Sequence, residues 1–103
     1  MDQSNFYIGQ LVQHLKFDYR GVIVDVDATF EGTEAWYDQV ALSRPPKDQP
    51  WYHVLVDQSD QMTYVAQRHL GDDESDEPIE NPEIEQYFDH FIDGVYQKRS
   101  RLN

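Results

Sequence analysis

Three short runs of alternating apolar and polar residues set the strongest limit on what this chain can fold into. They are VIVDVD at 22–27, WYHVLV at 51–56 and MTYVAQ at 62–67. Successive side chains of a strand point to opposite faces, and β-branched and aromatic residues fit its pleated surface. A fourth run, YIGQLVQHLK at 7–16, predicts a first strand with a bend at Gly9. The chain is therefore expected to consist mainly of β-strands.

The spacing of these runs predicts an antiparallel sheet. The polar turn at 57–61 joins the last two runs as a hairpin, and no alternation of strands with helices is visible. We therefore expect an all-β fold over residues 1–70, a small antiparallel barrel whose closure removes exposed strand edges. The residues expected to build this barrel are Gly9, Gly21, Val22, Val24, Trp51, Tyr52, His53, Val54, Tyr64 and Val65.

Residues 30–49 interrupt the strand pattern. Trp36 and Val40 have helical spacing, Thr33 is a candidate N-terminal cap, and Pro45-Pro46 cannot continue a helix. One or two helical turns are expected in this excursion.

The C-terminal third is predicted to lie outside the barrel. GDDESDEPIE at 71–80 lacks apolar periodicity, and repulsion between its like charges predicts an extended acidic linker. From Asn81-Pro82 onward, apolar residues recur at helical spacing and predict one amphipathic helix over 81–103. The aromatic face of this helix is expected to be buried, either on the barrel or on a partner.

The charge balance bears on the kind of partner. The 103 residues are enough for a single domain, and 20 Asp and Glu against 8 Lys and Arg give a formal net charge of −12. Such a surface repels phosphate backbones and anionic membranes unless a basic patch acts within a Debye length of about 8 Å. Protein partners are therefore favoured. Neither a signal peptide nor a membrane span is recognisable, so a cytoplasmic location is expected.

The residues of catalytic type form no motif. There is no cysteine, and the four histidines show no close ligand spacing, so neither a metal nor another cofactor is expected. No serine sits in a nucleophile elbow, and the isolated glycines form no phosphate loop. The chain is therefore expected not to be an enzyme. A remote alternative is a hydrolase that uses His53 with Asp25 or Asp27.

Two groups of residues are candidate contacts for a partner or for DNA. The first group combines cations with aromatic residues, and the second is a cluster of cations near the end of the chain. Binding to DNA would need about six to ten phosphate contacts, which would engage nearly every cation present. Whether copies of the chain associate is left open. The candidates are Trp36, Tyr37, Arg44, Lys47 and Arg68 in the first group, and Lys98, Arg99 and Arg101 in the second.

The order of three motifs resembles the HspQ family, also described as the YccV-like or hemimethylated-DNA-binding domain. The motifs are FYIGQLVQHLKFDYRGVIVDVD, DQPWYHVLVD and TYVAQRHL, and together they cover roughly residues 6 to 70. The tail NPEIEQYFDHFIDGVYQKRSRLN is similar to the helical end of some shorter members. At Gln67 the family commonly has glutamate.

The resemblance implies an SH3-like β-barrel that binds hemimethylated DNA. For HspQ proteins it also implies a heat-shock role, in which the protein is a substrate of the Lon protease and modulates its specificity. An acidic adaptor of proteolysis agrees with the net charge of −12, so we rank this function first and direct DNA binding second.

Overall fold

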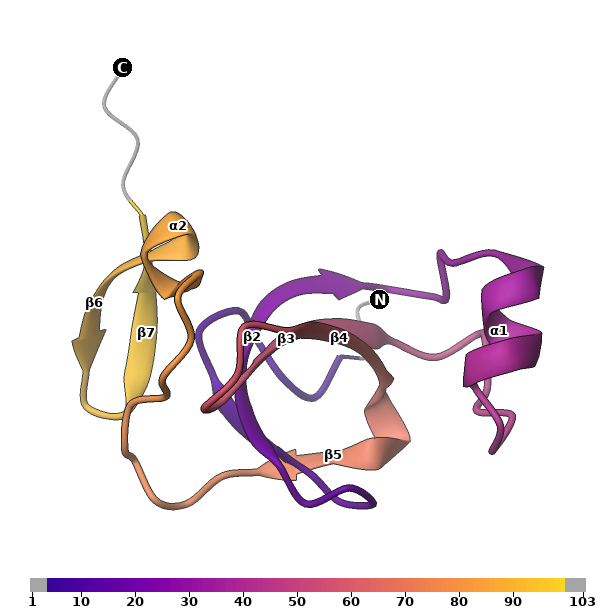
Figure 1. The fold of residues 1–103 in the computed structure, drawn as a ribbon, viewed down its shortest axis with the longest axis horizontal. Helices are drawn as coiled ribbons and strands as arrows, with labels where there is room; N and C mark the ends of the chain where they lie inside the picture. Colours follow the sequence, from indigo (N-terminus) through magenta and orange to yellow (C-terminus); the bar gives the residue numbers. More distant parts are fainter. Residues whose placement is uncertain (1–3, 100–103) are drawn as a thin grey trace.

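The computed structural model of the chain describes residues 4–99, which form two antiparallel sheets and short helical segments (Figure 1). The helices α1 and α2 have seven and four residues, so among the described residues no helix is long and apolar enough to cross a membrane. The elements are, in order, β1 Leu11–His14, β2 Arg20–Asp27, α1 Glu34–Val40, β3 Trp51–Val56, β4 Met62–Ala66, the 3₁₀ turn η1 Gln67–His69, β5 Leu70–Asp72, α2 Ile84–Tyr87, β6 Phe88–Ile92 and β7 Val95–Lys98.

The larger sheet has the strand order β4-β3-β2-β1-β5, and all its pairs are antiparallel. A β-bulge in β2, between Ile23 and Asp25, shifts the register against β3, and bulges of this kind bend a sheet. Gly21 allows the close approach of β2 and β3, because a Cβ at this position would lie 2.5 Å from the Leu55 carbonyl oxygen. In Figure 1 the sheet curls so that β5 faces β3 and β4.

The curled sheet does not close into the predicted barrel. β4 pairs only with β3, β5 pairs only with β1, and no ladder joins β4 to β5. The turn η1 carries the chain directly across this opening, and the three-residue β5 is already paired with β1. A side-chain hydrogen bond spans the opening instead, with Tyr19 Oη 2.7 Å from Thr63 Oγ1. β4 therefore keeps a free edge.

Both faces of the large sheet carry apolar side chains. The inside of the curl is filled by a cluster that includes the fully buried Ile23, Tyr52 and Val54. The outer face carries Val22, Val24 and Leu55, which pack against the C-terminal hairpin. Trp51 and Tyr37 anchor a third cluster under α1.

The predicted helix over 81–103 is wrong for most of the residues that the structure describes. Helical structure is limited to α2, and β6 and β7 form an antiparallel hairpin. The hairpin turns at Asp93-Gly94, where φ is +52° and +80°, and these left-handed angles cannot occur inside an α-helix. Phe91 pairs with Tyr96 across the strands, with ring centroids 4.6 Å apart. Apolar residues that suggested a helical stripe therefore meet across a turn.

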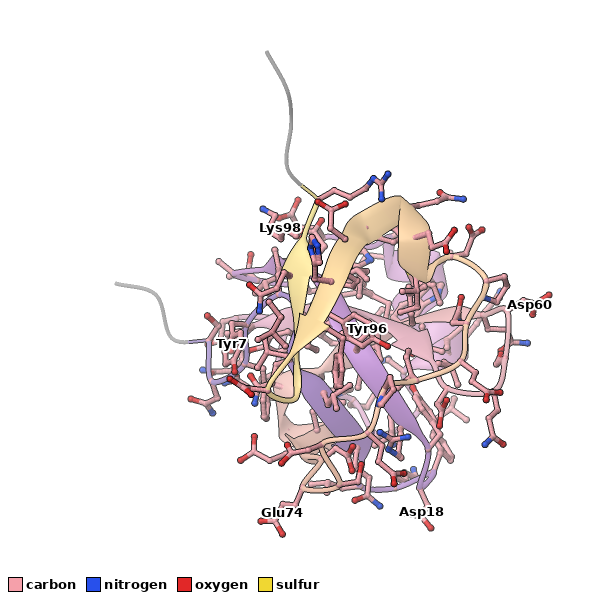
Figure 2. All side chains as sticks on the ribbon, turned by 90° about the vertical axis from the view of Figure 1, so that its left-hand side faces the viewer. Tyr7, Asp18, Asp60, Glu74, Tyr96 and Lys98 are labelled. Atoms are coloured by element: carbon pink, nitrogen blue, oxygen red, sulfur yellow. The ribbon has the colours of Figure 1, made fainter. Side chains whose placement is uncertain are left out.

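The hairpin is held against the large sheet by backbone and side-chain bonds. The Tyr96 N–H donates to the Gly9 carbonyl oxygen at 2.9 Å, and Gly9 has a φ of +95°. The Ile79 N–H donates to the Tyr96 hydroxyl at 3.1 Å. Figure 2 views the molecule from this side, with Tyr96 near the middle of the face and Glu74 projecting from the margin.

The segment predicted as an acidic linker, 71–80, starts within β5 and is tied to the sheet. Arg20 pairs with Asp57 at 3.0 Å and with Asp73 at 2.9 Å, and its guanidinium also donates to the Glu77 carbonyl oxygen. Further along this segment, Ile79 is buried in the cluster between sheet and hairpin. Its path is therefore fixed by one arginine and one apolar anchor.

Candidate functional site

A groove of about 470 Å³ runs along β4, between the β1–β2 turn and the end of α1. Every residue of β4 contributes to its lining, so the free edge of that strand faces the groove. The lining residues are His14, Lys16, Phe17, Tyr19, Trp36, Val40, Ala41, Leu42, Ser43, Pro45, Trp51, Met62, Thr63, Tyr64, Val65, Ala66 and His69.

The wall formed by α1 is fixed by its caps and by the loop that follows. As the sequence predicted, Thr33 caps the helix, and its Oγ1 accepts from the Trp36 N–H at 3.1 Å. Tyr37 is buried and its hydroxyl donates to the Pro45 carbonyl oxygen at 2.6 Å. Trp51 Nε1 donates to the Pro46 carbonyl oxygen at 3.1 Å. The double proline therefore holds the loop after α1 against β3.

Aromatic rings form the floor of the groove near α1. The ring of Tyr64 lies 5.2 Å from that of Trp51 and 5.7 Å from that of Trp36, centroid to centroid. Phe30 contacts the same three rings. Such packing gives a floor that is large, apolar and rigid.

The rim of the groove exposes apolar side chains to solvent. The exposed fractions are 68% for Phe17, 55% for Val40, 76% for Leu42 and 50% for Met62. These four residues come from a turn, a helix end, a loop and a strand, yet all of them line one groove. Contiguous apolar surface of this kind is typical of a site that binds another molecule.

His14 and His69 lie in the wall of the groove on the side of the β1–β2 turn. His14 is buried, and its Nδ1 accepts from the N–H groups of Lys16 and Phe17 at 3.2 and 3.0 Å, which shapes the β1–β2 turn. Its ring stacks on that of His69 at 5.7 Å. Burial lowers the pKa of His14, and the charges of His69 and Lys16 lower it further. Burial likewise lowers the pKa of His69, followed by the charges of Arg68 and Lys16.

The groove lacks negative charge although the chain is acidic. None of its 17 lining residues is Asp or Glu, whereas these make up 20 of the 103 residues of the chain. Within residues 4–99, Lys16 and Arg68 make no ion pair, and Arg68 instead donates to the Ser43 carbonyl oxygen at 2.7 Å. The Leu15 N–H donates to the His69 carbonyl oxygen at 2.8 Å, so Lys16, which follows Leu15, and Arg68, which precedes His69, lie near the same end of the groove.

The first group of predicted contacts is divided by the structure. Trp36 lines the groove and Arg68 adjoins it through Ser43, whereas Tyr37 is buried. The charges of Arg44 and Lys47 are paired with Asp38 and Glu34, and both cations lie over the Tyr37 ring.

The second group of predicted contacts is not at the groove. Lys98 belongs to β7 and Arg99 pairs with Asp89 at 3.1 Å, both at the C-terminal hairpin. In Figure 1 this hairpin and α1 lie at opposite ends of the molecule. Arg101 lies outside the described residues.

Sequence reasoning did not find the groove itself. The apolar rim residues and Lys16 were not singled out, because they belong to separate elements and share no motif. One available signal was the apolar residue Phe17 in the turn KFDYRG, where a polar residue is the norm.

A smaller cluster of titratable side chains lies on β2 and β3. His53 Nε2 is 3.2 Å from Asp27 Oδ2, which also accepts from the Tyr64 hydroxyl at 2.7 Å. Single ligand atoms of Asp25, Asp27 and His53 all lie within 4.8 Å of one another. Burial raises the pKa of Tyr64, and its hydrogen bond to Asp27 adds to this effect. Two carboxylates and an imidazole could hold a divalent metal, and they are the three residues named in the remote enzyme alternative.

The fold and the groove thus define a small antiparallel β-domain whose large sheet stays open, with an apolar groove along the free edge of β4. A family model described as hemimethylated DNA-binding protein YccV like matches residues 4–95. The chain therefore belongs to the YccV-like family, as the motifs in the sequence suggested.

Proposed function

We propose that the protein is a non-enzymatic, heat-shock-type adaptor that modulates the specificity of ATP-dependent, Lon-type proteolysis in the cytoplasm. The groove beside β4 is the surface that binds the protease or its substrates. The observation that carries this proposal is the gathering of the exposed Phe17, Leu42 and Met62 around a groove without carboxylates. Desolvating such side chains against a protein partner is favourable, at about 25 cal/mol for each Å² of apolar surface.

The charge of the chain supports a protein partner over a nucleic acid. The net charge is −12, and within residues 4–99 the four arginine and lysine side chains that pair with a carboxylate all lie outside the lining of the groove; they are Arg20, Arg44, Lys47 and Arg99. Few cations remain for phosphate contacts. The resemblance to HspQ proteins supplies the particular partner, a Lon-type protease.

A titration with a purified Lon-type protease tests this proposal. Saturable binding is expected, together with a changed rate of degradation of a fluorescent substrate. Phe17→Ser and Leu42→Ser should each weaken binding about tenfold, because each removes an exposed apolar contact. Ile92→Ser is the matched control, since Ile92 is 52% exposed on the distant hairpin. Equal affinity of all three variants and the wild type would contradict the groove as the binding surface.

Direct binding of hemimethylated DNA is the second candidate function. It is favoured by the description of the family whose model matches residues 4–95. Lys16 lines the groove and Arg68 donates to the carbonyl oxygen of the lining residue Ser43, and since neither makes an ion pair among the described residues, both are available for phosphate contacts. DNA binding predicts an anisotropy change that prefers a hemimethylated over a fully methylated duplex and weakens steeply between about 50 and 200 mM salt.

The remote enzyme alternative is tested at His53. In the adaptor proposal this imidazole does not line the groove; it bonds to Asp27 and packs on the ring of Tyr64. His53→Ala should therefore leave protease binding unchanged. Loss of function at unchanged thermal stability would favour an enzyme built on this cluster.

A further inference from the structure

We propose that the groove takes up an extended peptide segment that pairs with the free edge of β4 and carries a carboxylate group toward Lys16 and Arg68. The occupant is an apolar, acidic segment of a partner protein. This inference rests on the adaptor function proposed above and names the chemistry that its groove recognises.

The backbone of β4 provides the first part of this site. The Val56 N–H donates to the Gln61 carbonyl oxygen at 3.0 Å, and the Gln67 N–H donates to the Pro50 carbonyl oxygen at 3.1 Å. Bonds of an antiparallel ladder alternate along the strand, so the N–H and C=O groups of Met62 and Tyr64 point away from β3. Within residues 4–99 these outward groups have no hydrogen-bond partner. An added strand would satisfy them.

The lining provides the second part. An extended segment presents alternate side chains to the same side, and here they would meet Phe17, Leu42 and the aromatic floor. The volume of about 470 Å³ falls within the range of ligand sites and can accept a few side chains of such a segment. Main-chain bonds would thus give affinity, and the apolar lining would give preference for apolar residues.

The charges determine the third feature of the occupant. Lys16 lines the groove with His69, whose carbonyl oxygen accepts from the Leu15 N–H at 2.8 Å, and Arg68 donates to the carbonyl oxygen of the lining residue Ser43 at 2.7 Å. Neither cation makes an ion pair among the described residues. A carboxylate in the bound segment would complement both of them. The absence of carboxylates from the lining removes the repulsion that most of this acidic surface would impose.

A second copy of the chain is a poorer occupant of this groove. Symmetric pairing of β4 with β4 would bring against each groove a second lining without carboxylates, which offers Lys16 and Arg68 no charge partner. Each copy as a whole carries a net charge of −12, so two copies repel each other. The charges therefore favour a partner that brings its own carboxylates.

The test uses a fluorescein-labelled peptide in which valine alternates with threonine and two glutamates follow. Titration with the whole protein should give saturable anisotropy. Three control peptides are compared. In one, lysines replace the two glutamates; in the other two, alternate backbone nitrogens are N-methylated, one peptide for each of the two registers. We expect the lysine peptide and at least one methylated peptide to bind at least about tenfold more weakly.

Protein variants locate the bound segment. Met62→Pro removes an outward N–H without breaking the β3 ladder, and Met62→Ala removes only the side chain. The proline variant should lose binding by at least about tenfold relative to the alanine variant, with circular dichroism confirming its fold. Lys16→Glu and Arg68→Glu should each weaken binding of the acidic peptide and strengthen binding of the lysine peptide. Lys98→Glu is the control with the same charge change on the hairpin.

The inference is overturned if the methylated and unmodified peptides bind alike, or if Lys98→Glu acts as strongly as Lys16→Glu. It is also overturned if Met62→Pro instead abolishes a concentration-dependent dimer seen by sedimentation, because a second copy would then occupy the edge. These results are distinct from failure of the adaptor function. A protein that binds a Lon-type protease through Phe17 but ignores all the peptides retains its proposed function and loses only the strand-pairing mode.

Discussion

The hydroxyl of Tyr19 lies 2.7 Å from that of Thr63, and this hydrogen bond joins the β1–β2 turn to the free-edged strand β4. It is a side-chain link across the opening where no backbone ladder forms. Both residues also line the groove, so the bond helps to fix the distance between its two walls.

A double-mutant cycle at this bond measures its contribution to the fold. Tyr19→Phe and Thr63→Val should each lower the free energy of unfolding by about 1 kcal/mol, because each removes a hydrogen bond between two partly buried groups. The double variant should be less destabilised than the sum of the two single variants. Chemical denaturation checks this expectation. Strict additivity would show that the two hydroxyls do not interact in solution.

Gly94→Ala distinguishes the C-terminal hairpin from the helix that the sequence predicted. In the hairpin, Gly94 has a φ of +80°, and an added Cβ would lie 2.6 Å from Asp76 Oδ1. The left-handed conformation alone costs a residue with a Cβ about 1–2 kcal/mol, so the variant should unfold at a lower temperature. In a helix, the same change would stabilise the protein by about 1 kcal/mol. A rise in melting temperature would therefore contradict the hairpin.

Because Arg20 bonds to the acidic segment, we expect the free energy of unfolding to fall as the pH is lowered into the acid range. Burial alone would raise the pKa of Asp73, but hydrogen bonds from Ser75 and Arg20 and the charge of Arg20 lower it. Since the pKa is lower in the folded state, this stabilisation is present above the ordinary value of about 3.9 and is lost as the pH falls through the lowered value.

Asp73→Asn tests this dependence. It should cost about 1 kcal/mol near neutral pH, and the difference from the wild type should shrink below about pH 4. Denaturant titrations across this range measure it. Asp76→Asn, three residues further along the chain and without an ion pair to Arg20, is the control. A constant difference at all pH values would contradict the assignment to the carboxylate of Asp73.

The titration of His14, in the wall of the groove, should make the stability of the fold depend on pH in a second range. Its pKa is lowered in the folded state by burial and by nearby positive charge, so its neutral form stabilises the fold above about pH 6.5, and this contribution is lost as the pH falls. His14→Asn keeps an acceptor for the N–H groups of Lys16 and Phe17 but does not titrate. The variant should show a flatter stability profile between pH 7 and 5. An unchanged slope would mean that another group is responsible.

The large sheet could be predicted from the sequence because its signals are local. The runs at 22–27, 51–56 and 62–67 correspond to β2, β3 and β4 within about two residues, and Thr33 was correctly predicted to cap α1. Alternation and a cap each depend on a few neighbouring residues. The prediction of a closed barrel was wrong because closure depends on whether β4 and β5, the two edge strands, pair with each other. The alternation of residues within a strand carries no information about this pairing.

The C-terminal hairpin was mistaken for a helix because its apolar residues also have helical spacing. The Asp93-Gly94 pair was the contrary signal, since this dipeptide favours a tight hairpin turn. The candidate site was harder to foresee. Phe17, Leu42 and Met62 are far apart in the sequence, and only the fold brings them to one groove. Burial of Tyr37 and pairing of Arg44 likewise depend on contacts that no motif encodes.

Hydrogen–deuterium exchange with a bound Lon-type protease tests most directly the claim that the protein acts through the groove beside β4. The outward N–H groups of Met62 and Tyr64 exchange freely unless a partner covers the edge. Binding should slow exchange in residues 62–66 and in the turn at 15–19, and leave the hairpin at 88–98 unchanged. Protection confined to the hairpin, or protection of β4 by a hemimethylated duplex and not by the protease, would contradict the account.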